Sequence, residues 1–374
     1  MEASKYIIIL HNSIEKWLNS EENIAQVLNQ VHAKNLEKAY IISFESSYST
    51  AKKAVAHHAH SESIEIILIK KRTLIDYISL LICARKLKKI LSSFSSYILH
   101  AQDPLAGFIC IKAHNPKSCT QITIQAQQIL ASEYEYLHQH EKNIFKKWWH
   151  TLCVKQLQMI ETALYSTTQK SSIITIETIS PALKEFFFIT YGAQPQHIKV
   201  QSEEPHVVNL QDKDFFKATI RSELNLPQSA QLYCFKGNYV SRENPQEIIS
   251  FFKQRLQNDT QSFLLILSAD KDMFEIALRQ HQVPFDAYQV KTIEQSHSYR
   301  YLSACDAGII FRDMHIVNWT SKPANALEYK AAGLEIIHNN TIAYITKQIQ
   351  HDVAEFNMMA DVIDNKDSIN TQSP

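Results

Sequence analysis

A chain of 374 residues, 45% of them hydrophobic, exceeds the usual size of one hydrophobic core, so we expect two globular domains. Its 38 Lys and Arg balance its 38 Asp and Glu, which disfavours a nucleic-acid-binding protein because such proteins usually carry a basic excess. The six cysteines form no Cys-x-x-Cys pair, which indicates a reducing compartment, and the five glycines form no cluster of the kind that binds NAD.

The first half of the chain alternates apolar strands with helices. Runs at Lys5–Leu10, Ala39–Ser43 and Ile64–Ile69 predict parallel strands covered on both faces. The segment from Ser13 to His32 predicts one amphipathic helix, and the segment from Leu74 to Leu91 predicts another.

Three clustered histidines, His57, His58 and His60, raise the possibility of a metal site. Metal ligands on a helix usually lie four residues apart, and these do not. We therefore interpret them as part of a solvated surface.

A strand over Ser171–Glu177 and a helix that begins at Ser180-Pro181 and stops at Gly192 close the first half. A strand at His197–Gln201 follows, and we interpret the charged segment from Ser202 to Asp214 as a hinge.

The second half repeats the alternation. Strands are predicted at Gln231–Lys236, Ser262–Ser268 and Tyr288–Lys291. The helix after the first of them begins at Asn244-Pro245, with Glu247 completing a capping box.

An acidic pair, Asp270 and Asp272, follows the strand Ser262–Ser268. It has two interpretations: Asp270 is the N-cap of the next helix, or both carboxylates hold a divalent metal, as in a glycosyltransferase of the single-domain GT-A architecture. We rank the cap first, because the chain shows two domains.

The segment from Ser303 to Ile337 organises the second half. After the strand Ala307–Phe311 and a polar loop, we expect a helix from Asn325 to Ala332, with Pro323 near its first position and Gly333 as its left-handed stop. Loops that lead from a strand into a helix bind phosphates in α/β proteins, because free N–H groups and the helix dipole point there. The N–H groups near Ser321 are therefore candidate phosphate donors.

Residues of this segment match one spaced pattern: Asp306, Gly308, Arg312, Asp313, Val317, Asn318, Glu328, Tyr329, Ala331, Gly333, Leu334 and Ile337. In this pattern the chain resembles the family 4 glycosyltransferases of the GT-B fold, whose bacterial members carry D-x-G-(apolar)-x-R-(D/E), V-N, and S-x-K-x-x-E-Y-x-A-x-G-L-P-(V/I)-I. A weaker similarity continues from Ile98 to Tyr136.

The resemblance implies a nucleotide-sugar site at Glu328, whose carboxylate would accept bonds from ribose hydroxyls. The chain departs from the family twice: the usual Lys is Asn325, and the other acidic position is Thr320. Lys322 is a candidate replacement for the missing positive charge. The alternative is that Glu328 only stabilises the first turn of its helix.

The resemblance also implies a basic residue that holds the donor diphosphate in the loop after Gln231–Lys236. Arg242 is the first candidate, one residue out of register, because its planar fork meets phosphate oxygens bidentately. Lys236, next to Gly237, is the second candidate, and Arg312 is a third.

Acceptor-side residues are implied in the first half. His11 and Asn12 follow the first strand, where relatives have a glycine-rich loop. His100 lies in a segment that resembles a strand–His–helix unit of the family, as a catalytic candidate or a structural histidine. Gln125 stands where relatives carry charged groups.

The resemblance predicts an α/β protein of two facing Rossmann-like domains with parallel sheets and helices on both faces. We expect the acceptor-side domain at 1–200, the donor domain at 201–345, a helix at 346–361 that crosses back to the first domain, and a polar tail at 362–374. The predicted function is transfer of a sugar from a UDP- or GDP-linked donor to a glycan or lipid-linked acceptor, with retention and without metal or cofactor. The alternative is a catalytically degenerate subunit that serves as a partner or scaffold.

Membrane contact is a further expectation. No apolar run reaches the roughly 18 residues that span a bilayer, and the N-terminus does not resemble a signal peptide, so we expect a cytoplasmic protein. The run Lys146-Lys147-Trp148-Trp149 has the composition of an interfacial anchor and suggests peripheral contact with the inner membrane. A half-buried helix would account for it equally well.

Overall fold

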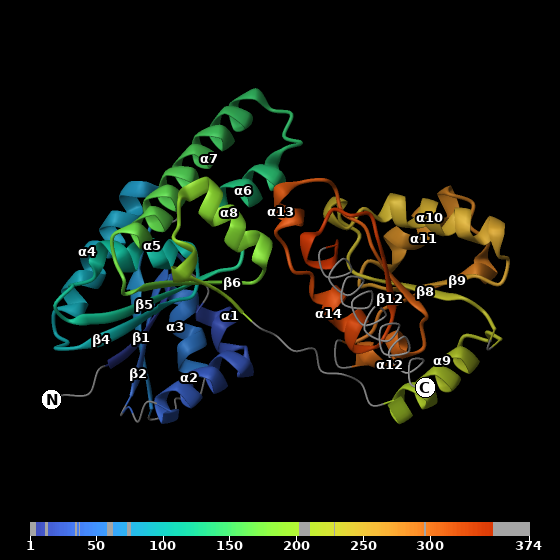
Figure 1. The fold of residues 1–374 in the computed structure, drawn as a ribbon, viewed down its shortest axis with the longest axis horizontal. Helices are drawn as coiled ribbons and strands as arrows, with labels where there is room; N and C mark the ends of the chain where they lie inside the picture. The colour runs from blue at the N-terminus through green and yellow to red at the C-terminus, as the bar shows by residue number, and fades with distance from the viewer. Residues whose placement is uncertain are drawn as a thin grey trace, which may run out of the picture. The chain divides into compact units, whose positions relative to one another are not determined.

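The computed structural model describes residues 5–11, 14–33, 36, 38–57, 63–72, 76–201, 210–227, 229–294 and 297–346. Its contacts divide the chain into two compact units, Met1–Gln201 and Ser202–Pro374. Each unit contains one parallel β-sheet with helices on both faces, which confirms the predicted fold class (Figure 1).

The first unit contains a seven-stranded sheet in the order β3-β2-β1-β4-β5-β6-β7. All of its neighbouring strands run parallel. In chain order the strands are β1 (Lys5–Leu10), β2 (Ala39–Glu45), β3 (Ile64–Lys70), β4 (Tyr97–Ala101), β5 (Cys119–Ala126), β6 (Ile174–Thr178) and β7 (Ile198–Val200).

Two groups of helices cover opposite faces of this sheet (Figure 1). The group beside β1 and β2 comprises α1 (Ile14–Leu18), α2 (Glu21–Ala33) and α3 (Tyr48–His57), which build one apolar core with these strands. The other group consists of α4 (Tyr77–Leu91), α5 (Pro104–Ala113), α6 (Leu130–His138), α7 (Ile144–Tyr165) and α8 (Pro181–Tyr191). In this group α5 packs on β4 and β5, and α8 packs on β6 and β7.

Helix α5 is the centre of the second group because it is buried almost throughout. It packs between the sheet and both α4 and α7. A Cβ added at Gly107 would lie 2.6 Å from Cγ2 of Ile124, so this glycine lets α5 approach β5 closely.

The second unit contains a five-stranded parallel sheet in the order β10-β9-β8-β11-β12. Its strands are β8 (Leu232–Lys236), β9 (Phe263–Leu267), β10 (Tyr288–Lys291), β11 (Ala307–Ile310) and β12 (Glu335–His338). Its helices are α9 (Leu210–Glu223), α10 (Pro245–Asn258), α11 (Lys271–Gln280), α12 (Ser298–Ser303), α13 (Ile316–Trp319) and α14 (Ala324–Ala331).

Two apolar cores lie on the two faces of this sheet. Helices α10 and α11 pack on one face around Phe235, and α9, α12 and α14 pack on the other around Tyr329. A Cβ at Gly308 would overlap the Tyr329 ring, so the glycine of the D-x-G pattern is needed for α14 to sit on β11.

Both sheets have the doubly wound order, which fixes where a ligand can bind. The order reverses between β1 and β4 in the first unit and between β8 and β11 in the second. Ligands of such sheets bind outside the carboxyl ends of the strands at this reversal, because the connecting loops diverge there.

Several predicted boundaries are corrected. The helix predicted from Ser13 to His32 is two helices, because the Ser20 hydroxyl accepts the Asn23 N–H at 3.4 Å and starts α2. Asn244 precedes α10 in a left-handed conformation (φ 48°) and makes no side-chain cap bond, so there is no capping box. The helix predicted from Asn325 to Ala332 is α14, Ala324–Ala331, and Pro323 is its N-cap residue, next to the first helical position as predicted.

Other predictions were accurate. Gly192 and Gly333 both adopt the left-handed conformation that ends their helices, with φ of 65° and 67°.

Some predictions fall outside the described residues. They concern His58, His60, most of the predicted helix at 346–361 and the tail at 362–374.

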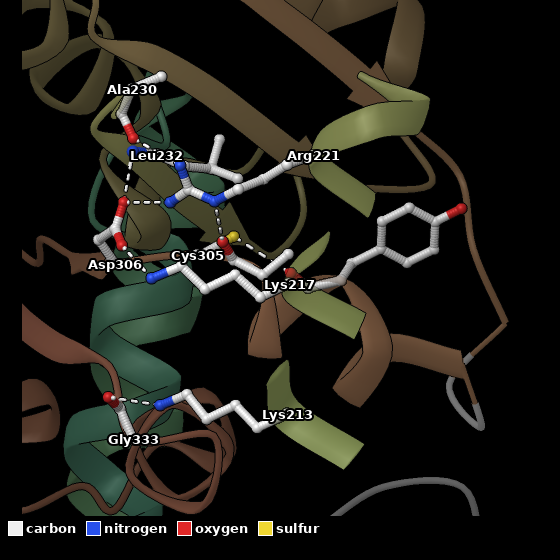
Figure 2. Close-up of polar contacts among 10 residues, drawn as sticks. Lys213, Lys217, Arg221, Ala230, Leu232, Cys305, Asp306 and Gly333 are labelled. Carbon is white, nitrogen blue, oxygen red and sulfur yellow. Dashed lines mark hydrogen bonds and ion pairs between the residues drawn. The ribbon is translucent and has the colours of Figure 1, made fainter. Parts of the chain in front are cut away.

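The predicted hinge from Ser202 to Asp214 is wrong in its last part, because Asp212 to Asp214 lie in α9. Lys213, Lys217 and Arg221 stand four residues apart and share one face of this helix (Figure 2). Lys213 Nζ donates to the Gly333 carbonyl at 3.3 Å, and the other two contact Asp306. This cationic spacing is the signal that could have revealed the helix.

Asp306 ties α9 to the start of the sheet (Figure 2). Its carboxylate accepts Arg221 Nη2 at 2.6 Å, Lys217 Nζ at 3.2 Å and the Leu232 N–H at 2.8 Å. Arg221 is buried, and its Nη1 donates to the Ala230 carbonyl at 2.7 Å. Burial alone would raise the pKa of Asp306, but the Leu232 N–H, Arg221 and Lys217 outweigh it and hold the pKa below its usual value.

Replacing Asp306 should therefore destabilise the second unit. We expect Asp306→Asn to lower the free energy of unfolding by about 2–4 kcal/mol, because the Arg221 charge stays buried without its partner. Lys217→Met, which removes a more exposed partner, should cost less than about 1 kcal/mol. Urea unfolding measures both.

The pH dependence supplies a second check on this carboxylate. A carboxyl group whose pKa is lowered by folding stabilises the protein above its unfolded pKa, and this stability is lost as the pH falls through the folded pKa. The difference in the free energy of unfolding between wild type and Asp306→Asn should therefore become smaller below about pH 4. A constant difference down to pH 3 would contradict this role of Asp306.

Candidate functional site

An ion pair lies at the reversal point of the second unit. Lys236 ends β8, and its Nζ lies 2.6 Å from Oε2 of Glu328 in α14 and 3.3 Å from Oγ of Ser298. The side chains of Lys236 and Glu328 are 17% and 25% exposed, so both are half-buried but reachable from solvent. The structure thus brings together two of the predicted donor-site residues.

The backbone of Lys236 is fixed as firmly as its side chain. Its N–H donates to the Tyr329 hydroxyl at 2.9 Å, and its carbonyl accepts Asn325 Nδ2 at 3.2 Å. Asn325, which stands at the usual lysine position, therefore braces the strand end from α14. The positive charge beside Glu328 comes instead from β8.

The two predicted arginines lie together at the same edge of the sheet. Arg242 Nε donates to Oδ1 of Asn318 at 3.3 Å, and Arg312 Nη1 donates to the Arg242 carbonyl at 3.1 Å. Arg312 also forms an ion pair with Glu243 at 2.8 Å and is only 7% exposed. Arg312 therefore serves as a buried brace of the 242–243 segment, whereas Arg242 is half-buried.

Two asparagines that are not among the predicted site residues hold these arginines. Asn318 is fully buried, and its Nδ2 donates to the Asp313 carbonyl at 2.9 Å while its Oδ1 faces Arg242. Asn339 brackets Arg312, accepting its N–H at 3.3 Å and donating to its carbonyl at 2.8 Å. Asn339 has no sequence signal beyond its place after a strand.

The remaining predicted donor residues lie in the same loops. Gly237 donates its N–H to the Leu267 carbonyl at 3.2 Å. Ser321 donates both its N–H and its hydroxyl to the Asn318 carbonyl, so its N–H is already used. Lys322 places its ammonium 5.5 Å from the centre of the Tyr344 ring. Thr320 is buried and donates to the Ile316 carbonyl at 2.9 Å.

The acidic pair after β9 takes part in the fold. Asp270 is the N-cap residue of α11 by position, but its carboxylate accepts the Tyr239 N–H at 2.8 Å and so tethers the loop after β8. Asp272 lies in the first turn of α11. Among the described residues, no group of three or more His, Cys, Asp and Glu is arranged to hold a metal ion.

The predicted acceptor-side residues fall at or near strand ends of the first unit. His11 follows β1, is 5% exposed and contacts Lys71. His100 lies inside β4, with its ring centre 6.2 Å from that of Tyr6. Gln125 lies inside β5, on the same sheet face as His100. Asn12 lies outside the described residues.

Solved structures that match this chain include glycosyltransferases. A glycosyltransferase from Rickettsia africae matches with a TM-score of 0.52 at 10% identity, over 91% of this chain and 80% of that one. The lipopolysaccharide outer core galactosyltransferase WaaB matches with a TM-score of 0.55 at 12% identity, over 90% and 81%. A UDP-forming trehalose-phosphate synthase from Burkholderia vietnamiensis matches with a TM-score of 0.52 at 8% identity, over 91% of this chain and 85% of that one.

The chain has the GT-B glycosyltransferase fold. No family model matches its sequence, and no curated protein matches it. At these identities the likeness concerns the GT-B fold alone, so what the site does must be argued from its residues.

The two arginines should respond differently to substitution. Arg312→Met should lower the free energy of unfolding by about 2–4 kcal/mol, because the carboxylate of Glu243, 18% exposed, loses its partner. Arg242→Met should have a smaller effect, because Arg242 is half-buried and its bond to Asn318 is to a neutral amide. Equal effects of the two substitutions in urea unfolding would contradict this division of roles.

Proposed function

We propose that the chain is a glycosyltransferase that moves a sugar from a nucleoside diphosphate donor to a glycan or lipid-linked acceptor. The observation that carries the proposal is the Lys236–Glu328 pair at the strand-order reversal of the second unit. A carboxylate and an ammonium group side by side match the two parts of such a donor, ribose hydroxyls and diphosphate. A UDP-forming enzyme among the similar structures favours UDP over GDP.

The proposed roles rest on the positions and the chemistry of these side chains. Glu328 accepts ribose hydroxyls, while Lys236 and the fork of Arg242 hold the diphosphate as it leaves. One well-placed donor to a leaving group contributes about 3 kcal/mol to the transition state. The proposal includes no metal, because these cations supply the positive charge. It also includes retention of anomeric configuration, which rests on the resemblance to the family alone. His100 and Gln125, which lie on one sheet face, are the proposed acceptor-side groups. His11, which directly follows β1, is a third.

A non-catalytic scaffold is the second candidate function. It is favoured by Thr320, which occupies the family's acidic position as a buried residue bonded to its own helix. Such a protein would keep the fold without transferring sugar.

Nucleotide binding separates the two candidates. Saturation at 100 times Kd adds about 2.7 kcal/mol of stability, so UDP or GDP should raise the melting temperature of the wild type. Glu328→Gln should weaken nucleotide binding about 10- to 100-fold, because bonds to a charged group are lost. It should also lower the ligand-free stability, because the half-buried Lys236 loses its charged partner, so affinities are compared in the folded protein. Glu335 is the first residue of β12 and so lies at the amino edge of the sheet, away from Glu328. Glu335→Gln is therefore the matched control and should bind nucleotide like the wild type.

Two results would count against the glycosyltransferase. No melting shift with any nucleotide or nucleotide sugar at millimolar concentration would favour the scaffold. If Glu328→Gln unfolded the protein while the folded fraction kept wild-type affinity, Glu328 would be structural and the donor site would be misplaced.

Peripheral contact with the inner membrane is part of the proposal. The first turns of α7 expose Ile144, Phe145, Trp148 and Trp149 to 81%, 84%, 63% and 50%. Figure 1 shows this end of α7 at the tip of the α6–α7 pair, next to the loop that joins the two helices. The later turns of α7 are half-buried, with Leu157 and Ile160 in the core, but its first turns expose both tryptophans. Exposed aromatic side chains next to Lys146 and Lys147 suit an anionic lipid surface. No helix in the described ranges is long and apolar enough to cross a bilayer.

Vesicle binding tests the contact. Replacing Lys146, Lys147, Trp148 and Trp149 together should release the protein from anionic vesicles in a sedimentation assay, because apolar and charge contacts are both lost. Replacing the exposed Lys88 and Lys89 of α4 by Gln removes equal charge elsewhere and should leave binding largely intact. A wild type that never sediments with vesicles would remove this part of the proposal.

A further inference from the structure

The sheet of the first unit ends in a long apolar edge strand. β3 is the outermost strand, and among the described strands it pairs with β2 alone. It has seven residues, whereas the strands at the other three sheet edges, β7, β10 and β12, have three, four and four. Proteins protect sheet edges with short strands, prolines or bulges, because an unpaired edge attracts another strand. β3 contains no proline, and its register with β2 is regular, so it is the least protected of these edges.

One hydrogen bond at the end of β3 shows which of its backbone groups face outward. The Lys71 N–H donates to the Glu45 carbonyl of β2 at 3.0 Å. Because the backbone groups of successive residues in a strand point to opposite sides, the odd-numbered residues of β3 face β2. The N–H and carbonyl groups of the even-numbered residues, including Ile66 and Leu68, therefore point to the open edge.

The side chains of β3 are apolar on both faces of the sheet. Ile66 and Leu68 pack against the core that β1 and β2 form with α1, α2 and α3. Ile67 and Ile69 lie on the other face, and all four side chains are half-buried. Within the described ranges, the one side chain that bonds the open edge is Lys86 of α4, whose Nζ donates to the carbonyl of the last residue of β3 at 2.6 Å. The edge thus offers both backbone groups and apolar surface to another strand.

The charges of this segment identify the strand that fits. β3 has Glu65 near its start and is followed through its end by three consecutive cations, Lys70, Lys71 and Arg72. A second copy of β3 related by a two-fold axis runs antiparallel, which places the acidic start of each strand beside the basic end of the other. Parallel pairing would place like charges side by side. The segment is therefore complementary to itself.

We propose that two copies of this chain pair through β3, so that their seven-stranded sheets join antiparallel, edge to edge. In the register that overlaps the whole strand, Ile66 of each copy exchanges backbone hydrogen bonds with Leu68 of the other. The two Ile67 side chains then form the closely spaced, non-hydrogen-bonded pair on the two-fold axis. One pair of edge strands is a small interface, so the dimer forms reversibly at micromolar concentration. The pairing does not depend on the nucleotide site proposed for the second unit.

Sedimentation velocity of the full chain tests the dimer. The wild type should change from monomer to dimer between about 1 and 100 μM. Ile67→Lys should weaken this association about tenfold or more, because two ammonium groups would face each other on the axis. Ile67→Val, which keeps a β-branched apolar side chain there, is the matched control and should associate like the wild type. A wild type that stays monomeric, or equal association of Ile67→Lys and Ile67→Val, would overturn the proposal.

Hydrogen exchange of the wild type avoids dependence on how Ile67→Lys folds. The outward amides of Ile66 and Leu68 should exchange more slowly as the protein concentration rises through the range of dimer formation. The amide of Val200 in β7, at the other edge of the same sheet, should not respond. Protection of β3 that is the same at every concentration would mean that the chain itself covers this edge, and fast exchange at every concentration would mean that nothing does. Either result would overturn the proposal.

The exposed aromatic residues of α7 are the competing contact between two copies. Replacing Trp148 and Trp149 together by Ala should leave the association unchanged, because β3 carries the contact. A dimer that is lost in this double variant but kept in Ile67→Lys would place the contact on α7 and overturn the pairing through β3.

Discussion

The reversal of strand order between β8 and β11 is the constraint on which the candidate site depends. It brings the ends of two adjacent strands together while their connecting loops turn to opposite faces, so Lys236 and Arg312 meet at one edge. Helix α14 delivers Glu328 to that edge, and it can do so only because Gly308 leaves room for Tyr329. Packing in the core of the second unit thus sets the position of its most polar groups.

Charge at this edge is largely paired within the protein. Glu328 faces Lys236, and Glu243 faces the buried Arg312. A nucleoside diphosphate would therefore have to compete with Glu328 for Lys236, or share it while ribose takes the carboxylate. In the proposed function this arrangement keeps a half-buried cation ready at the site without leaving its charge uncompensated when no ligand is bound.

The strands and the helix stops could be predicted because they depend on local signals. Continuous apolar runs marked β1, β9 and β11, and Gly192 and Gly333 marked helix ends. The pairing of Lys236 with Glu328 could not be predicted from local signals, because the two residues lie 92 apart in the sequence. Arg312 matched the family pattern as a ligand residue, but its burial against Glu243 became visible only with the fold.

The five glycines of the chain provide the most direct test of the central claim, that the second unit binds the donor nucleotide at the end of β8. Protein labelled with ¹⁵N only at glycine should give one backbone amide signal for each, assigned from triple-resonance spectra of a uniformly labelled sample. Titration with UDP and with GDP should shift Gly237, next to Lys236, and leave Gly107 and Gly192 of the first unit unchanged. Shifts confined to the first unit, or no shift at millimolar nucleotide, would contradict the account.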